Sequence, residues 1–195
     1  MLTALQDAML QNGGTISTKQ VLSLGISKTS LTNYVRSGEI ERVEPGVYIL
    51  PDTLEDDMYM LALHSSKITF SHETALFLNN LSDRTPFIHS VTIPSNSSLS
   101  SQLRQQCRCF YINAKLIDLG KEVRKTTFGH DVPCYNAERT ICDLLRSQNH
   151  YSIELITDAL KKYAESTGKN LNILSEYAER LHVQKRLRPY MEVLL

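Results

Sequence analysis

The stretch "ISKTSLTNYVRSGEIERVEPGVYIL", residues 26–50, joins a short polar segment to an alternating one. Ser27 favours a helix N-terminus and Gly38 favours a helix end, so the pattern predicts a helix over residues 28–37. Only a few of its residues can face a core, namely Leu31, Val35 and Tyr34. The opposite face of this helix is therefore expected to meet solvent or a partner.

The segment after this helix predicts a hairpin. Apolar residues alternate over residues 40–49, and Pro45-Gly46 divides them, which is typical of two short strands joined by a tight turn. Two further helices are expected upstream, over residues 2–12 and about 18–24, the second with a cap at Ser17 or Thr18. Three helices and a two-stranded wing are the order of a winged helix-turn-helix, which we place at residues 1–51.

A break at residues 51–57 separates this domain from a second one at residues 58–195. Pro51 opens the break and four acids follow within it. The chain of 195 residues is long enough for two domains. The fold class expected is α+β, because the second domain combines a small sheet with helices and ends in a helical third.

The expected elements of the second domain follow from periodicity and from caps. Helices are expected at 58–64, from a Ser71 cap to about 81, from about Asn136, and over about 152–165, 171–182 and 184–194, where Pro189 can kink or end the last one. Strands are expected at 88–94, 107–112, about 123–128 and 132–135, with a loop or weak helix before the second.

Composition excludes several classes of protein. Lys plus Arg and Asp plus Glu number 21 each, so the chain is not a uniformly basic nucleic-acid binder. The N-terminus lacks the basic region of a signal peptide, and no apolar run is long enough to span a membrane. The four cysteines show no secreted pattern. We therefore expect a cytoplasmic protein with reduced cysteines and no membrane partner.

The neutral total conceals a segregation of charge. Acids predominate over residues 51–83, whereas bases predominate over residues 101–128. The segment 180–188 carries four bases and no acid: Arg180, Lys185, Arg186 and Arg188. A solvated helix face explains any one cluster, but three of them beside a helix-turn-helix favour a nucleic-acid surface. The four bases are thus candidate contacts to a DNA backbone.

The helix at 28–37 is expected to read DNA, because a helix that enters the major groove keeps its outer face polar. An Asn such as Asn33 can pair with adenine, and an Arg such as Arg36 can meet guanine or phosphate. Arg42 on the wing is the expected backbone contact. The candidate DNA-binding residues are Lys19, Ser27, Lys28, Thr29, Ser30, Thr32, Asn33, Arg36 and Arg42. The alternative is a protein-docking module, since winged helices also serve that role.

Three segments resemble the AbiEi-type antitoxins. They are the G-x-I-x-R-V-x-x-G-V-Y pattern at 38–48, "ITFSHETALFLNNL" at 68–81 and "VPCYNAERTICDLL" at 132–145. These proteins are the antitoxin and autorepressor of the AbiE abortive-infection toxin–antitoxin systems, classed as type IV and active in phage resistance. The sequence departs from the expected pattern at Glu44, where many relatives would carry a base, and this acid would weaken wing contacts to phosphate.

The resemblance implies a division of labour between the two domains. The first would bind double-stranded DNA at inverted repeats ahead of its own operon and repress transcription. The second would counter a nucleotidyltransferase-like toxin, without a stable complex between the two proteins. The alternative is an antitoxin that docks directly on its toxin and does not read an operator.

Other candidate sites carry less weight. Cys107, Cys109, His130 and Cys134 could form a zinc site, but there is no Cys-x2-Cys knuckle and cysteines are common in buried strands. No metal and no cofactor are therefore expected.

Two polar clusters are also explained without catalysis. Adjacent residues such as Ser71, His72 and Glu73 rarely converge on one atom; Ser71 is better read as a helix cap, and the other two as lining a polar cleft or touching a partner. Arg139 and Asp143 are spaced to form an ion pair along one helix. A nuclease is the third interpretation, but its acidic cluster is missing, so no enzymatic activity is expected.

Overall fold

The computed structural model describes residues 2–194, which form two compact units. The N-terminal unit comprises residues 2–64 together with 125–131, and the C-terminal unit comprises 65–124 together with 132–194. Both units combine helices with a small sheet, so the α+β class is confirmed. The domain limits expected from the sequence stay a prediction.

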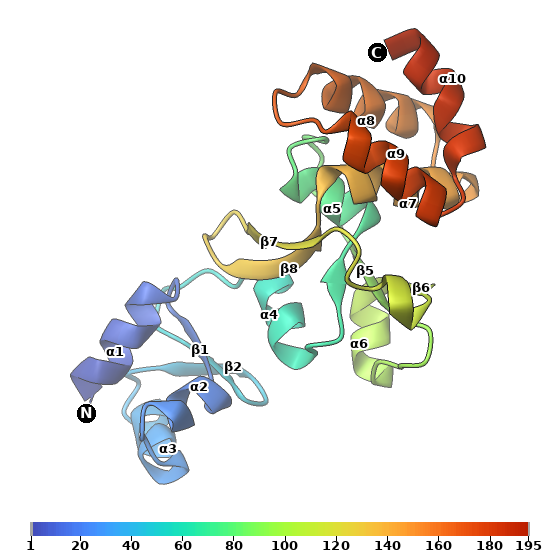
Figure 1. The fold of residues 1–195 in the computed structure, drawn as a ribbon. Helices are drawn as coiled ribbons and strands as arrows, with labels where there is room; N and C mark the ends of the chain where they lie inside the picture. Colours follow the sequence, from blue (N-terminus) through green and yellow to red (C-terminus); the bar gives the residue numbers. More distant parts are fainter. Residues whose placement is uncertain (1, 195) are drawn as a thin grey trace. The chain divides into compact units, whose positions relative to one another are not determined.

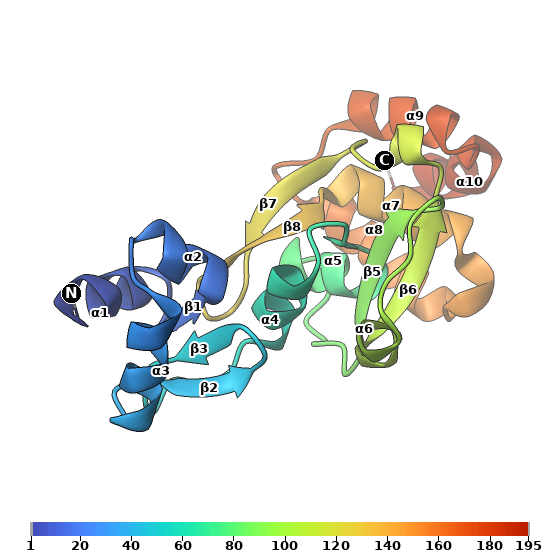
Figure 2. The ribbon, with the colours of Figure 1, turned by 90° about the horizontal axis from the view of Figure 1, so that it is seen from below.

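The N-terminal unit combines helices with a small sheet (Figure 1). This sheet is antiparallel and three-stranded, of order β1-β3-β2. The elements of this unit are α1 (Leu2–Gln11), β1 (Thr15–Ser17), α2 (Thr18–Ser23), α3 (Lys28–Arg36), β2 (Glu41–Glu44), β3 (Val47–Ile49) and α4 (Asp57–His64). The helices and the hairpin were expected, whereas β1 was not. Figure 2 shows the β2–β3 hairpin and α3 within this unit.

Caps and a small core explain why these short helices form. Ser17 makes a capping box with Gln20 at the start of α2, and the hydroxyl of Ser27 accepts a hydrogen bond of 3.1 Å from the amide of Ser30. One apolar cluster joins all the elements up to β2: Leu5, Met9, Ile16, Val21, Ile26, Leu31 and Ile40. In α3 only Leu31 is fully buried, and Tyr34 and Val35 pack against the cluster from its margin, so the opposite face of the helix is exposed.

Residues 125–131 complete the N-terminal unit from a distant part of the chain. His130 is buried and its Nδ1 lies 2.7 Å from the carboxylate of Asp56, while its Nε2 lies 3.0 Å from the carbonyl oxygen of Asn12. The ring of Tyr59 stacks on the imidazole at 4.1 Å between centroids. The hydroxyl of Thr126 donates to the same carboxylate. These contacts form a polar core beside the apolar one.

The C-terminal unit contains a five-stranded sheet of order β6-β5-β4-β8-β7. Its strands are β4 (Thr69–Phe70), β5 (His89–Pro94), β6 (Cys107–Ile112), β7 (Lys121–Lys125) and β8 (Asp131–Tyr135). The β4–β5 pair is antiparallel, whereas β4–β8 and β5–β6 are parallel. The turn between β7 and β8 belongs to the N-terminal unit. The four strands predicted from the sequence are confirmed within a few residues.

Helices account for the rest of this unit. They are α5 (His72–Leu78), α6 (Ser101–Gln106), α7 (Ala137–Arg146), α8 (Ile153–Glu165), α9 (Leu171–Arg180) and α10 (Gln184–Leu194), with one-turn 3-10 helices at Ala114–Leu116 and Gln148–His150. Asn136 caps α7 by accepting a hydrogen bond from the amide of Arg139. The helix α10 continues through Pro189. The helical end of the chain is therefore confirmed.

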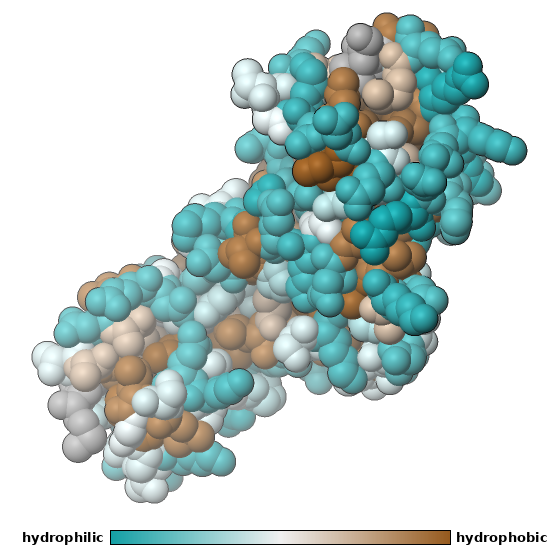
Figure 3. All heavy atoms as spheres, in the orientation of Figure 1, coloured by the Kyte–Doolittle hydropathy of each residue, from teal (hydrophilic) through white to brown (hydrophobic). Residues whose placement is uncertain are grey.

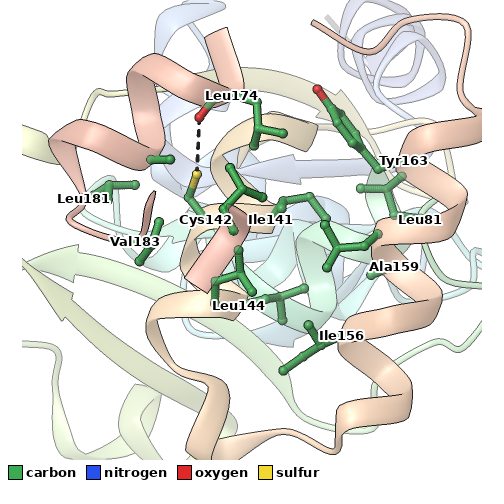
Figure 4. Close-up of a cluster of buried hydrophobic side chains, with 14 of the residues drawn as sticks. Leu81, Ile141, Cys142, Leu144, Ile156, Ala159, Tyr163, Leu174, Leu181 and Val183 are labelled. Atoms are coloured by element: carbon green, nitrogen blue, oxygen red, sulfur yellow. Dashed lines mark hydrogen bonds between the residues drawn. The ribbon is translucent and has the colours of Figure 1, made fainter. Parts of the chain in front are cut away.

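The core of this unit lies between α7 and the three helices that follow it (Figure 4). Ile141 and Leu144 of α7 pack among residues of α8, such as Ile156, and the backbone carbonyl of Leu174 in α9 lies 3.9 Å from Cys142 Sγ. Burial of this kind contributes roughly 25 cal/mol for each Å² of apolar surface. None of the helices in the described part of the chain has the length and hydrophobicity needed to cross a bilayer.

Candidate nucleic-acid interface

The surface of α3 is polar along almost its whole length. Leu31 is buried, Tyr34 and Val35 are half-buried, and most other positions face solvent. The side chains of Lys28, Thr29, Thr32, Asn33 and Arg36 are exposed, and Ser30 is half-buried. One face of this helix therefore packs on the core, and the opposite face is exposed to solvent or to a partner.

Two rows of exposed side chains follow from the helical spacing. Lys28, Thr32 and Arg36 lie at i, i+4 and i+8, so they line one row, and Thr29 and Asn33 line the row beside it. Each row reaches from the first turn to the last. A helix presented in this way matches the width of a DNA major groove.

The hydrogen bonds of α3 divide its polar side chains into two groups. Ser27 caps the helix and meets Ser30 Oγ at 3.0 Å, and the Thr32 hydroxyl donates to the Lys28 carbonyl at 2.9 Å. Within residues 2–194, the side chains of Lys28, Thr29, Asn33 and Arg36 make no hydrogen bond or ion pair. These four side chains are the ones free to contact a ligand.

The β2–β3 hairpin is anchored at its turn. The amide of Thr18, at the start of α2, donates to the carbonyl oxygen of Gly46 at 2.8 Å, and Gly46 has a φ of +88°, which a side chain would strain. Arg42 is exposed on β2, and among the described residues its side chain makes only a long bond of 3.4 Å to the Glu44 carbonyl. Its guanidinium is thus available at the edge of the hairpin.

Glu44, the acid that departs from the expected pattern, has a partner inside the N-terminal unit. Its carboxylate is hydrogen-bonded to the imidazole of His64 at the end of α4. Both side chains are about a quarter exposed. The acid therefore ties the hairpin to α4, and this internal role of His64 could not be found from local sequence.

The charged side chains of α2 and α3 are all basic, whereas the segment after α3 includes Glu39, Glu41 and Glu44. Residues 8–38, which include α2 and α3, contain Lys19, Lys28 and Arg36 and no acid. Lys19 is exposed on α2, at the turn next to Thr18. An acid-free face that carries lysine and arginine attracts phosphate groups.

Three of the four basic side chains near the C-terminus are engaged in hydrogen bonds or ion pairs within the C-terminal unit. Arg186 donates from Nη1 to the carbonyl oxygens of Leu145 and Arg146, at 2.8 and 3.0 Å, and so closes the end of α7. Arg180 and Arg188 pair with glutamates one turn away, and Lys185 is exposed and has no such partner within residues 2–194. Their contact with DNA stays a prediction.

The four residues weighed as a zinc site do not come together. His130 is held by Asp56 and Asn12, and the described residues include no group of three or more potential metal ligands in one place. Burial raises the pKa of Cys107 to about 11 and that of Cys134 to about 12. These thiols therefore stay protonated and behave as core side chains.

Ser71 and His72 occupy the interior of the C-terminal unit. Ser71 stands at the N-cap position of α5, but its hydroxyl does not cap the helix; it accepts from Thr92 and meets His72 Nδ1 at 3.0 Å. The expected capping bond is therefore wrong. His72 is fully buried and stacks on Phe110, so its expected place in a cleft is also wrong.

The environment of His72 favours the neutral ring. Burial lowers the pKa of His72 to about 4, and this effect outweighs the opposing influence of Asp143. The neighbouring Glu73 is half-buried and pairs with Arg108 at 3.1 Å. The ion pair predicted between Arg139 and Asp143 is confirmed, with Nε 2.9 Å from Oδ2 and both residues fully buried.

Comparisons with known proteins agree with this geometry. Residues 5–51 match a family model described as "Transcriptional regulator, AbiEi antitoxin", which confirms the resemblance indicated by the sequence. The crystal structure of RV2827C protein from Mycobacterium tuberculosis is similar, with a TM-score of 0.56 and 10% identity over 96% of this chain and 79% of that one. At this identity the likeness shows the fold alone. No curated protein matches the chain.

Proposed function

We propose, from the AbiEi-type regulator domain at residues 5–51, that the chain is a sequence-specific DNA-binding repressor of its own promoter. The N-terminal unit acts as a winged helix-turn-helix, with α3 in the major groove and the β2–β3 hairpin beside the duplex. The observation that supports this most is the exposed, acid-free face of α3, whose side chains at 28, 29, 33 and 36 have no partner in the described chain.

Each group of candidate residues has a different role in this proposal. Asn33 and Arg36 read base edges, because amide and guanidinium groups make paired bonds to adenine and guanine. Lys19, Lys28 and Arg42 contact phosphates and set the register. The hydroxyls of Ser27, Thr29 and Ser30 lie at the start of α3, where a helix N-terminus favours a phosphate. Those of Ser27 and Ser30 already bond to each other, so Thr29 offers the uncommitted hydroxyl.

The same proposal includes an antitoxin role in the cytoplasm. One copy reads one half-site, so an inverted repeat engages two copies. The C-terminal unit then counters a nucleotidyltransferase-like toxin of an AbiE-type, type IV system that acts in phage resistance. No catalytic step is assigned to the chain. The family model, whose description includes both regulator and antitoxin, supports this pairing of roles.

Anisotropy measurements test the DNA-binding proposal. The full chain is titrated with the DNA upstream of its own gene and with a scrambled duplex, at about 50 and 200 mM salt. Preferential binding that weakens steeply with salt is expected. Asn33→Ala and Arg36→Ala should each cost about 1–3 kcal/mol on the native site and reduce the preference over the scrambled duplex.

A matched control separates readout from folding. Ser23→Ala removes an exposed hydroxyl at the end of α2 that bonds only to the Gln20 carbonyl, outside the proposed contact face. This variant should bind both duplexes as the parent chain does. Unchanged sequence preference in both α3 variants would exclude α3 as the recognition helix.

A second function is favoured by one observation: the N-terminal unit exposes several large apolar side chains, namely Leu10, Leu22, Leu24 and Leu54. The face of this unit seen in Figure 3 shows hydrophobic and hydrophilic residues side by side. Exposed apolar side chains suit a protein partner. Direct docking on the toxin predicts co-purification of the two chains and equal affinity for both duplexes.

A further inference from the structure

A cavity of about 470 Å³ opens in the C-terminal unit, between the end of α5, strand β7 and the loop from α8 to α9. Its lining includes two cationic side chains, Arg124 and Lys162, and the hydroxyl-bearing Ser166 and Thr167, but no acid. A neighbouring cavity of about 380 Å³ shares Lys162 and includes three acids: Asp83, Glu154 and Asp158. The lining of the first cavity is therefore purely basic in its charged residues, whereas that of the second is mixed.

Arg124 is held in a fixed position at this cavity. Its Nε donates to the side-chain oxygen of Asn79 at 3.0 Å, and the amide nitrogen of Asn79 donates to the carbonyl oxygens of Ala75 and Tyr135 at 2.7 and 2.9 Å. Nη1 bonds to Glu122 at 2.6 Å and to the backbone at Val123. Nη2 makes no hydrogen bond within the described chain, so one edge of the guanidinium stays available to a ligand.

Lys162 forms a weak ion pair that a ligand anion could replace. It pairs with Asp83, whose side chain is 91% exposed, and an ion pair so open to water contributes little. The ammonium group can therefore exchange this carboxylate for a ligand anion at small cost. Lys162 lies on α8, so it approaches the cavity from an element different from that of Arg124.

The loop from α8 to α9 adds neutral donors. The backbone N–H groups of Thr167 and Gly168 donate to no oxygen in the part of the chain that the structure describes, and both residues line the cavity. Within residues 2–194 the hydroxyl of Thr167 makes no hydrogen bond, whereas that of Ser166 donates to the carbonyl oxygen of Tyr163 at 2.8 Å. Two cations with free amide donors form the donor set that proteins use for phosphate groups.

We propose that this cavity binds phosphate, either as the free inorganic anion or as the phosphate groups of a nucleotide. Arg124 provides directed hydrogen bonds, Lys162 provides a mobile charge, and the amides of Thr167 and Gly168 complete the shell. The volume falls within the range of small-molecule sites. This site is separate from the residues assigned to DNA and does not depend on that assignment.

Titration of the full chain tests the site. The ¹⁵N-labelled protein is titrated with inorganic phosphate, pyrophosphate and ATP, and the amide signals of Thr167 and Gly168 should shift in a saturable way. Arg124→Gln and Lys162→Gln should each weaken binding by roughly tenfold, the effect of losing one charged donor. Because affinity for a cationic site rises with the charge of the anion, ATP is compared with pyrophosphate. Tighter binding of ATP than of pyrophosphate would identify a nucleotide as the ligand, and binding of ATP no tighter than that of pyrophosphate would identify the inorganic anion.

The control is Lys161→Gln, one position away on α8, where an exposed lysine lines the neighbouring cavity and not the proposed one. It should leave the affinity unchanged. If Lys161→Gln and Lys162→Gln weaken binding equally, the loss reflects the net charge of the surface and not a specific contact, and the proposal fails. It also fails if none of the three anions shifts the loop amides at millimolar concentration. Should Arg124→Gln unfold the unit, Lys162→Gln and the parent chain still decide the question.

Discussion

The imidazole of His130 and the carboxylate of Asp56 lie 74 positions apart in sequence, yet they meet at 2.7 Å inside the N-terminal unit. Neither side chain is more than 2% exposed. The carboxylate also accepts from the amide of Tyr59 at 3.1 Å, so Asp56 is the N-cap of α4. One buried carboxylate thereby joins the start of α4 to the turn between β7 and β8.

Removal of His130 should destabilise the N-terminal unit. We expect His130→Ala to lower the free energy of unfolding by about 3 kcal/mol, because a buried carboxylate loses its main partner. Amide hydrogen exchange in α1 and β3 is the appropriate measurement, since a chain of two units need not unfold in one step.

The neighbouring exposed pair provides the control for this change. Lys125 and Asp131 meet at 2.9 Å, but both side chains are more than half exposed. Asp131→Asn should cost under about 1 kcal/mol. Similar losses from the two variants would contradict a special role for the buried pair.

Gly13 is expected to tolerate no side chain. Its φ is +59°, and a Cβ there would lie 2.5 Å from His130 Nε2. Gly13→Ala should therefore cost at least about 1 kcal/mol more than Gly25→Ala, which has a similar φ of +77° but open space around it. Thermal unfolding of both variants measures the difference.

A double variant sharpens this comparison. If the clash with the imidazole is the cause, Gly13→Ala combined with His130→Ala should cost less than the sum of the two single changes. Additive losses would show that the backbone conformation alone penalises alanine at Gly13.

The C-terminal unit should become less stable as the pH falls, because His72 titrates at a lower pH in the folded chain than in the unfolded one. Its folded pKa, about 4, lies below the unfolded value of 6.5, so the unfolded chain binds the proton more readily. The contribution is complete above pH 6.5 and is lost as the pH falls toward 4, by roughly 3 kcal/mol.

The His72→Asn variant isolates this effect. Asparagine accepts the positive φ of this position, 50°, and does not titrate. Urea unfolding at pH 7 and pH 5 compares the two chains, and the parent should lose more stability between these values. Asp143, Arg146, Arg139 and His150 all influence the ring electrostatically, so the difference between the chains is informative and the parent slope alone is not.

Arginine at position 139 should not be replaceable by lysine. Its Nε binds Asp143, while Nη1 donates to the carbonyl oxygens of Leu116 and Leu119 at 3.0 and 2.8 Å. A lysine cannot make these bonds together, so Arg139→Lys should lower stability by about 3 kcal/mol in urea unfolding. Arg146→Lys is the control, since Arg146 lies 3.7 Å from the same carboxylate and is partly exposed, and it should cost under about 1 kcal/mol.

Arg42 should contribute charge to DNA binding but no sequence preference. The Arg42→Gln variant is expected to reduce the slope of log affinity against log salt by about one unit and to weaken operator and scrambled duplex alike. Anisotropy over a series of salt concentrations gives both quantities. A change in preference with an unchanged slope would instead assign base readout to the wing.

Local patterns predicted the features that depend on neighbours in sequence. The cap at Ser27, the hairpin at Pro45-Gly46 and the Arg139–Asp143 pair all arise within a few residues, and all are confirmed. Strand β1 was not foreseen because three residues are too few to show alternation. The expected cap at Ser71 failed because its hydroxyl bonds to Thr92, on a different strand.

The candidate site was also predicted only where its features depend on neighbours in sequence. The exposed face of α3 follows from its apolar spacing, but the partner of Glu44 does not, since His64 lies on a helix 20 positions later. Nothing near Asp56 or His130 marks them as partners. Contacts of this kind are decided by how the whole unit packs, and single-sequence periodicity carries no information about them.

The contribution of residues 125–131 also sets an order of events during synthesis. A ribosome that has made residue 64 must add more than sixty residues before His130 can reach Asp56, which takes several seconds at roughly 5–20 residues per second. Until then the nascent N-terminal unit lacks its polar core. Fragments that stop short of the β7–β8 turn carry α3 without the contacts that fasten α4. If α3 binds DNA as proposed, a prematurely terminated chain should bind the operator more weakly than the finished protein.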